Sequence, residues 1–278
     1  MLMNARVNKS SLPATSKASA RRAPAGKLAA SRATRVGIGG WTYEPWRNNF
    51  YPPGLPHREE LAFASRKLSA IEVNGTYYST FKPAVFAKWR DETPDDFVFS
   101  LKANRFATNR KLLATAGESI DRFINSGISE LGTKLGPIVW QFMSTKKFEA
   151  DDFEAFLALL PASVDGCPLR HVLDVRHESF ATPEYLALAH RYRCVTVHTD
   201  AENFPAIADA DGEFAYLRLM RSQSNIDTGY ASRELDQWAA GACAWCSGSR
   251  GREAFVFFIN GAKERAPAAA MALLDRLQ

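Results

Sequence analysis

The sequence lacks the features that identify several large classes of protein. It has no run of apolar residues near the roughly 18 that a membrane-spanning helix needs, although 46% of its 278 residues are hydrophobic. It contains no GxSxG, HExxH or GxxxxGK[ST] motif, and the GIGGW at 37–41 departs from the dinucleotide-binding GxGxxG. We therefore expect no cofactor and no membrane partner.

Cysteine is also scarce. The four cysteines are too few for a disulfide scaffold in a chain of this length. Cys243 and Cys246 form a CxxC pair in a helix-like stretch, 232–246, but no second pair or paired histidine completes a zinc site. Their i, i+3 spacing suits small residues on the buried face of a helix. The pattern favours a reduced, cytoplasmic compartment.

Positive charge is unevenly distributed along the chain. The formal net charge is +5, yet residues 1–34 alone carry seven Lys and Arg residues and no acid. The remaining 28 basic and 30 acidic residues leave the body near neutral. A nucleic-acid-binding domain usually carries its positive charge on the folded domain itself. We therefore do not expect the folded body to bind nucleic acid.

The basic segment 1–34 is rich in Ala and Ser and poor in large apolar residues, so it cannot build a core. We predict a disordered basic extension over 1–34, followed by one domain over 35–278. The acid-free composition of this segment is also typical of organellar transit peptides. An organelle is therefore the alternative to the cytoplasm as the location.

Eight strand-like runs recur after residue 34. Each run is short, mostly apolar and rich in β-branched or aromatic residues, as strands covered on both faces are. They lie at 35–41, 70–78, 96–103, 135–142, 170–177, 194–200, 214–221 and 254–260.

Seven helix-like stretches alternate with these runs, at 59–68, 83–91, 117–131, 151–160, 183–192, 232–246 and 265–277. Only the connection AENFPAIADADGE, after the sixth run, is too short and broken for a helix. Alternating strands and helices predict a parallel sheet, and eight strands close into a barrel. The fold class is α/β, a single (β/α)8 TIM-type barrel.

Polar side chains stand at the ends of nearly every strand-like run, where barrel active sites form. Residues two apart share a face of a strand. The candidates on this rule are Glu72, Asn74, Lys102, Gln141, Asp174, Arg176, His198, Asp200, Arg218 and Asn260. The list contains three acids, Glu72, Asp174 and Asp200, and three bases, Lys102, Arg176 and Arg218. A network of salt bridges among these six side chains is the structural alternative to a ligand site. Their concentration at one end of the barrel favours a ligand site.

The excess of cationic and amide groups among these candidates suits a small anion, such as a carboxylate, a phosphate ester or a nucleotide. Trp41, Tyr43 and Tyr77 follow the first two strands and are candidate ligand walls. A divalent metal is the rival ligand for the carboxylates and His198. Because the neighbouring lysine and arginines compete with a cation, we predict no metal site.

The ordered segments GIGGWTYEPWRNNFYP, AIEVNGTYYSTF, FVFSLKANR, LDVRHESF and FINGAKERAPAAAMALL resemble the motifs of the YecE-like family, domain-of-unknown-function family 72. The resemblance covers about residues 35–277. It implies a TIM-type barrel without an established reaction, and it marks many of the same strand-end residues. This chain departs from the family pattern after Gln141, after Leu219, at Asp174 and at Gly261.

Together these features favour an enzyme, a metal-independent hydrolase, lyase or isomerase, that acts on a small anionic molecule. In this hypothesis Glu72, Lys102 and Asp174 are catalytic, with Lys102 or Glu72 moving a proton, and Arg176 and Arg218 bind the anion. The other candidates would bind or orient the substrate. The alternative is a non-catalytic protein that binds a ligand, or nucleic acid through the basic extension.

Overall fold

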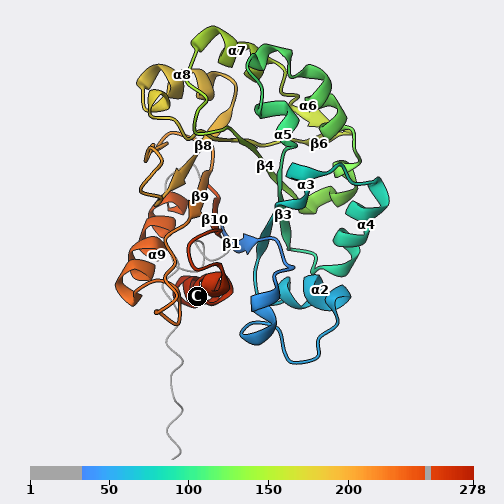
Figure 1. Cartoon of the computed structure of the whole chain (residues 1–278), viewed down its shortest axis with the longest axis vertical. Helices are drawn as coiled ribbons and strands as arrows, with labels where there is room; N and C mark the ends of the chain where they lie inside the picture. The colour runs from blue at the N-terminus through green and yellow to red at the C-terminus, as the bar shows by residue number, and fades with distance from the viewer. Residues whose placement is uncertain (1–32, 248–251) are drawn as a thin grey trace, which may run out of the picture.

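The computed structural model describes residues 33–247 and 252–278, and their strands form a closed parallel barrel (Figure 1). The order around the ring is β1-β10-β9-β8-β7-β4-β3-β2. The strands are β1 (Thr34–Gly39), β2 (Ala70–Val73), β3 (Val98–Lys102), β4 (Leu135–Gln141), β7 (His171–Asp174), β8 (Cys194–Thr199), β9 (Ala215–Leu219) and β10 (Ala254–Phe258). The predicted α/β barrel of the TIM type is confirmed.

Helices surround this ring on the outside, as Figure 1 shows. They are α2 (Glu60–Ala64), α3 (Gly75–Tyr78), α4 (Pro83–Glu92), α5 (Arg105–Thr108), α6 (Gly117–Ile124), α7 (Ala150–Ala158), α8 (Pro183–Arg191), α9 (Ser232–Cys246) and α10 (Ala266–Leu277). Residues 200–214, which join β8 to β9, form no helix, as their sequence predicts.

Three local details differ from the sequence prediction. The second strand ends at Val73, because Asn74 leads into the single turn α3. The helix expected over 117–131 is divided into α6 and a 3-10 segment, η4 (Ile128–Lys134), since Gly127 adopts a φ of 101° that ends a helix. A short antiparallel hairpin, β5 (Ser163–Val164) with β6 (Cys167–Pro168), was not predicted.

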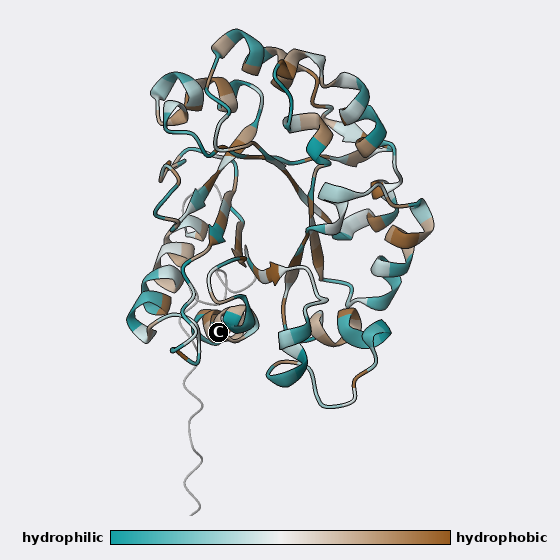
Figure 2. Ribbon diagram, viewed as in Figure 1, coloured by the Kyte–Doolittle hydropathy of each residue, from teal (hydrophilic) through white to brown (hydrophobic). Residues whose placement is uncertain are grey.

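Two apolar clusters hold the barrel together, and the strands appear predominantly hydrophobic in Figure 2. The outer cluster lies between strands and helices; in it, Phe99 of β3 packs on Trp89 of α4, with ring centroids 6.1 Å apart. The inner cluster fills the barrel with side chains such as Val98, Val172 and Phe257. Most residues of the barrel strands are therefore buried whichever face they lie on, as their apolar sequences predict.

Most of the predicted basic extension, residues 1–32, lies outside the described residues. Thr34 already belongs to β1, where it pairs with Ala254 of β10. None of the helices in 33–247 and 252–278 is long and apolar enough to cross a membrane.

Candidate functional site at the carboxyl ends of the strands

The inner faces of four strands bring charged side chains together near the carboxyl end of the barrel. Glu72, Lys102, Asp174 and Arg218 stand on β2, β3, β7 and β9, and each is in phase with residues of the inner cluster. All four are less than 7% exposed. Burial of so many charges requires that most of them be paired.

Arg218 is the centre of this cluster. Its Nη2 lies 3.0 Å from Glu72 Oε1, and its Nε lies 3.0 Å from Glu72 Oε2. Its Nη1 donates to Asp174 Oδ2. The two carboxylates raise the pKa of Arg218 beyond its ordinary value in spite of its burial. A permanently charged guanidinium on β9 thus joins β2 and β7, neither of which neighbours β9 in the sheet.

Glu72 is held further by Tyr216, whose hydroxyl donates to Oε2 at 2.9 Å. The Tyr216 hydroxyl also lies 2.7 Å from Ser100 Oγ, which donates to the Pro137 carbonyl at 2.8 Å. Burial, then the charge of Glu72, raises the pKa of Tyr216 well above its ordinary value. Both oxygens of Glu72 are therefore engaged inside the barrel.

Arg176 lies just beyond β7 and closes one side of the cluster. Its Nη2 donates to Asp174 Oδ2 at 2.9 Å and to Gln141 Oε1 at 2.8 Å. Its guanidinium also packs over the ring of Phe204, 4.6 Å from the centroid. With 17% of its side chain exposed, Arg176 is the most accessible of the ion-paired residues in the cluster.

Lys102 differs from the arginines because, among the described residues, no carboxylate forms an ion pair with it; Glu72 and Asp174 pair with arginines instead. Its Nζ lies 4.3 Å from the centroid of the Tyr77 ring, and the residue is 6% exposed. Burial, followed by the positive charge of Arg218, lowers the pKa of Lys102 to about 8. An amine with this pKa is suited to accept a proton near neutral pH.

Two asparagines stand at the mouth of the barrel. Asn74 occupies space left by Gly39, where a Cβ would lie 2.8 Å from Asn74 Nδ2. Asn260 follows β10, is exposed, and has Nδ2 3.8 Å from Met220 Sδ. Asn260 lines a groove of about 610 Å3 that also includes Phe204, which contacts Arg176. The groove therefore adjoins the charged cluster.

His198 and Asp200, predicted from β8, are not brought into the cluster. In the β8–β9 register, His198 is opposite Leu217 and Thr199 is opposite Arg218. Because residues opposite each other in a parallel pair point the same way, His198 faces outward toward α9. Asp200 accepts hydrogen bonds from Met220 N at 2.6 Å and from the Tyr230 hydroxyl at 2.7 Å.

Trp41 and Tyr43 pack against other loops and helices. The ring of Trp41 meets Trp89 of α4 edge to face, with centroids 5.2 Å apart. Tyr43 meets Trp46 in the same way at 5.3 Å, and Lys263 Nζ lies 4.4 Å from the Tyr43 centroid. Of the three predicted aromatic walls, Tyr77 is the one in contact with the charged cluster, through Lys102.

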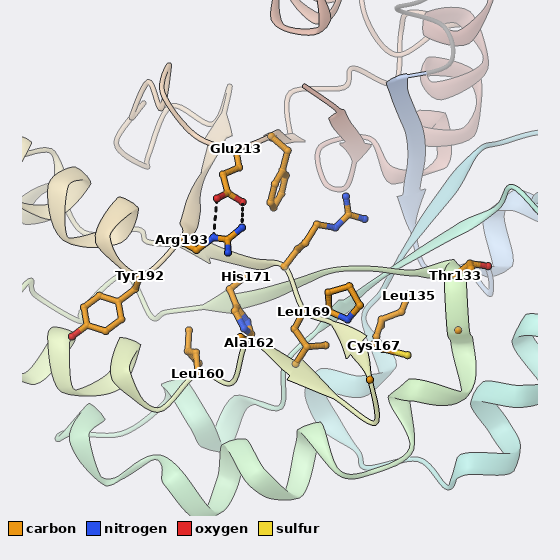
Figure 3. A pocket seen from close by; sticks show the side chains of 15 residues that line it. Thr133, Leu135, Leu160, Ala162, Cys167, Leu169, His171, Tyr192, Arg193 and Glu213 are labelled. Carbon is orange, nitrogen blue, oxygen red and sulfur yellow. Dashed lines mark hydrogen bonds and ion pairs between the residues drawn. The ribbon is translucent and has the colours of Figure 1, made fainter. Parts of the chain in front are cut away.

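A cavity of about 760 Å3 lies at the opposite, amino end of the strands (Figure 3). In Figure 3 Arg193 and Glu213 pair across one side, and His171 lies at the wall. His171 is buried and makes two hydrogen bonds. Trp140 Nε1 donates to its Nδ1 at 3.1 Å, and its Nε2 lies 2.8 Å from the Pro161 carbonyl oxygen. Its contacts are those of a packed residue, and this end of a barrel normally serves stability.

No group of three or more His, Cys, Asp or Glu residues in the described parts of the chain is arranged to hold a metal ion. The two buried carboxylates of the cluster, Glu72 and Asp174, are bound instead by Arg218. Their lone pairs thus already receive guanidinium donors.

Three residues that contact the site are not among the candidates chosen from the sequence: Ser100, Tyr216 and Phe204. The signal for the first two was present, since Ser100 precedes Lys102 by two residues and Tyr216 precedes Arg218 by two. Phe204 gave none, because it stands in the irregular connection between β8 and β9.

Residues 35–278 match the family model described as "Protein of unknown function DUF72". A DUF72 family protein of Thermotoga maritima has a similar structure, with a TM-score of 0.68 and 21% identity over 87% of this chain and 98% of that one. One from Enterococcus faecalis has a TM-score of 0.65 and 14% identity over 88% and 94%. At these identities the likeness shows the fold.

The UPF0759 protein YecE of Escherichia coli K12 is 27% identical over 148 residues. That alignment covers 52% of this chain, which spans about half (49%) of the length of the relative. The family match, by contrast, extends over the whole barrel and over every charged residue of the cluster. The chain therefore belongs to the DUF72 family of proteins of unknown function.

Proposed function

We propose that this protein is an enzyme that acts on a small anionic molecule at the carboxyl end of the barrel. The observation that carries the proposal is the environment of Lys102. Its amine is nearly buried, faces Tyr77 and has no carboxylate partner among the described residues, while the nearby Arg176 is partly exposed. An uncompensated positive site of this kind favours an anion.

In the proposed reaction, Lys102 accepts a proton from the bound substrate. With a pKa of about 8, about one tenth of the lysine is neutral at pH 7, and the neutral amine is the proton acceptor. Arg176 Nη1, for which the described residues provide no hydrogen-bond partner, binds the anionic group, and Asn74 and Gln141 orient it. Glu72 and Asp174 then act as positioning residues, because their oxygens hold Arg218 and Arg176.

Proton abstraction next to an anionic group is a step in isomerases, lyases and hydrolases alike, and all three classes are compatible with this arrangement. These residues supply positioning, positive charge and one base, which are sufficient for the proton transfer. The substrate class is accordingly a small carboxylate or phosphate ester with an acidic proton or a bond cleaved with base assistance.

Comparison of Lys102→Met with Lys102→Arg tests the proposal, once an anion that stabilises the wild type has been found. Loss of general-base catalysis lowers kcat by roughly 10²–10⁴-fold, and we expect this loss in both variants. The wild-type rate should rise with pH toward a plateau above about pH 8. Equal turnover by wild type and Lys102→Met would remove Lys102 from the reaction. Binding without wild-type turnover would make this a ligand-binding protein.

A further inference from the structure

The outer face of β8 is incompletely covered because no helix follows this strand. The connecting residues replace a helix over part of the strand. Asp209 Oδ2 accepts from the Thr196 amide at 2.8 Å, and the Ile207 carbonyl lies 3.4 Å from His198 Nδ1. Beyond these contacts, at the carboxyl end of β8, a cavity of about 360 Å3 remains between the strand and α9.

The walls of this cavity, which we call the α9 slot, are aromatic. They are formed by His198 from β8 and by Trp238 and Trp245 from α9. The two tryptophans are seven residues apart, which places them on one face of the helix. The His198 ring meets both edge to face, with centroids 6.0 Å and 6.1 Å away.

Gly241 lies between the two tryptophans and also lines the slot. In the interior of a helix, glycine is less favourable than alanine by roughly 1 kcal/mol. A Cβ at Gly241 would meet no atom within 4 Å, so the packing of the protein does not require glycine here. The missing side chain instead leaves this part of the slot open, as a ligand bound there would need.

The charge of the slot is negative. Asp200 and Glu234 line it, and their hydrogen bonds come from neutral donors: the Tyr230 hydroxyl and the Met220 amide for Asp200, and the Ala231 amide for Glu234. Arg221 also lines the slot, but its Nη2 is paired with Glu202 at 3.0 Å. Among the described residues, therefore, neither of these two carboxylates is ion-paired, and they outnumber the one cation, Arg221, that lines the slot.

We propose that the α9 slot binds a compact organic cation, an alkylammonium group held between the indoles of Trp238 and Trp245 and attracted by Glu234 and Asp200. Tryptophan is the strongest aromatic partner of such cations, contributing about 0.5–2 kcal/mol per contact. The volume of the slot, about 360 Å3, is at the lower end of the range for small-molecule sites. The slot lies on the outer face of β8, separate from the charged cluster inside the barrel.

The experiment is a tryptophan-fluorescence titration with choline and with its uncharged isostere, 3,3-dimethyl-1-butanol. Because the two probes share their shape, the difference in affinity reports the charge. We expect saturable choline binding, and isostere binding weaker by roughly tenfold, since one cation–π contact and one carboxylate together contribute about 1.4 kcal/mol or more. Equal affinity for both probes, or no saturable response to choline, would overturn the proposal.

Matched variants place the choline response in the slot. Gly241→Ala adds one methyl group and should keep the response, whereas Gly241→Leu fills the slot and should abolish it. Glu234→Gln should weaken choline binding several-fold and leave binding of the isostere unchanged. Trp41→Phe, at a distant packed site, is the control for fluorescence changes. An unchanged choline affinity in Gly241→Leu would place binding elsewhere and contradict the proposal.

Discussion

Arg218 and Glu72 form an ion pair inside the barrel, across strands that are not neighbours in the sheet: Nη2 donates to Oε1 at 3.0 Å, and Nε lies 3.0 Å from Oε2. Neither side chain is more than 2% exposed. A pair of this kind links the two strands, and removal of either residue leaves the other as a buried charge without its partner.

Removal of Arg218 should therefore destabilise the fold severely. Arg218→Met leaves Glu72 and Asp174 as buried carboxylates without their main cation, a change that costs about 3–5 kcal/mol of unfolding free energy. Urea denaturation measures the loss. The matched control is Arg122→Ala, because Arg122 and its partner Glu118 are 66% and 86% exposed and should contribute less than about 1 kcal/mol. A loss no larger than in the control would show that the ion pairs of Arg218 do not stabilise the fold.

Tyr216→Phe tests the second support of Glu72. The variant removes the hydroxyl that donates to Glu72 Oε2 and contacts Ser100 Oγ. A buried acceptor that loses its donor costs about 1–3 kcal/mol, so we expect a decrease of this size in the free energy of unfolding. Tyr78→Phe, at a ring that is 63% exposed, should leave stability unchanged. If the two variants are equally stable, the hydroxyl does not support Glu72.

Lys102 should destabilise the folded protein in a pH-dependent way. Its pKa falls from 10.5 in the unfolded chain to about 8 in the folded protein. Between pH 8 and pH 10.5 the unfolded chain therefore binds more protons than the folded protein. The resulting decrease in the free energy of unfolding is greatest below pH 8 and disappears as the pH rises toward 10.5. Lys102→Met should thus be more stable than wild type by on the order of 2–3 kcal/mol at pH 7, a difference that shrinks by pH 10.

Urea denaturation of both proteins at pH 7 and pH 10 checks this sign. Lys88→Met, at an exposed lysine on α4, is the control and should show no such pH dependence. A stability difference for Lys102→Met that is equal at the two pH values would mean that the Lys102 amine titrates alike in the folded and unfolded states.

The barrel and the charged cluster could be predicted from the sequence because alternation along a strand is a local property. Lys102 and Arg218 each stand in an apolar run, in phase with inward-facing residues, and Glu72 follows the same rule. Burial on both faces made these runs recognisable, and the positions of their polar residues then followed.

The phase of β8 could not be predicted in the same way. In CVTVHTD both faces carry small or apolar residues, so the sequence leaves open whether His198 or Thr199 points inward. The register with β9 decides it, since Thr199 lies opposite Arg218. His198 is tolerated on the outer face because the connection after β8 lacks a helix that would cover it.

Trp41 illustrates a second limit, because its partner Trp89 is 48 positions away in the chain and on a different element. Whether an aromatic residue after a strand lines the barrel mouth or packs on a helix depends on such distant contacts. Tyr77 lies at the mouth for an equally non-local reason, since Asn109 Nδ2 donates to its hydroxyl at 3.3 Å.

If the charged barrel mouth, with Lys102 and Arg176, is the ligand site, small anions should stabilise the native protein through these two residues. A thermal-shift screen of small carboxylates and phosphate esters against wild type and three variants measures this stabilisation, since a ligand that binds the native state raises Tm. We predict anions that raise the Tm of wild type and His198→Ala but not that of Arg176→Ala, with a reduced rise in Lys102→Met. The same rise in all four proteins, or no rise with any anion, would contradict the claim.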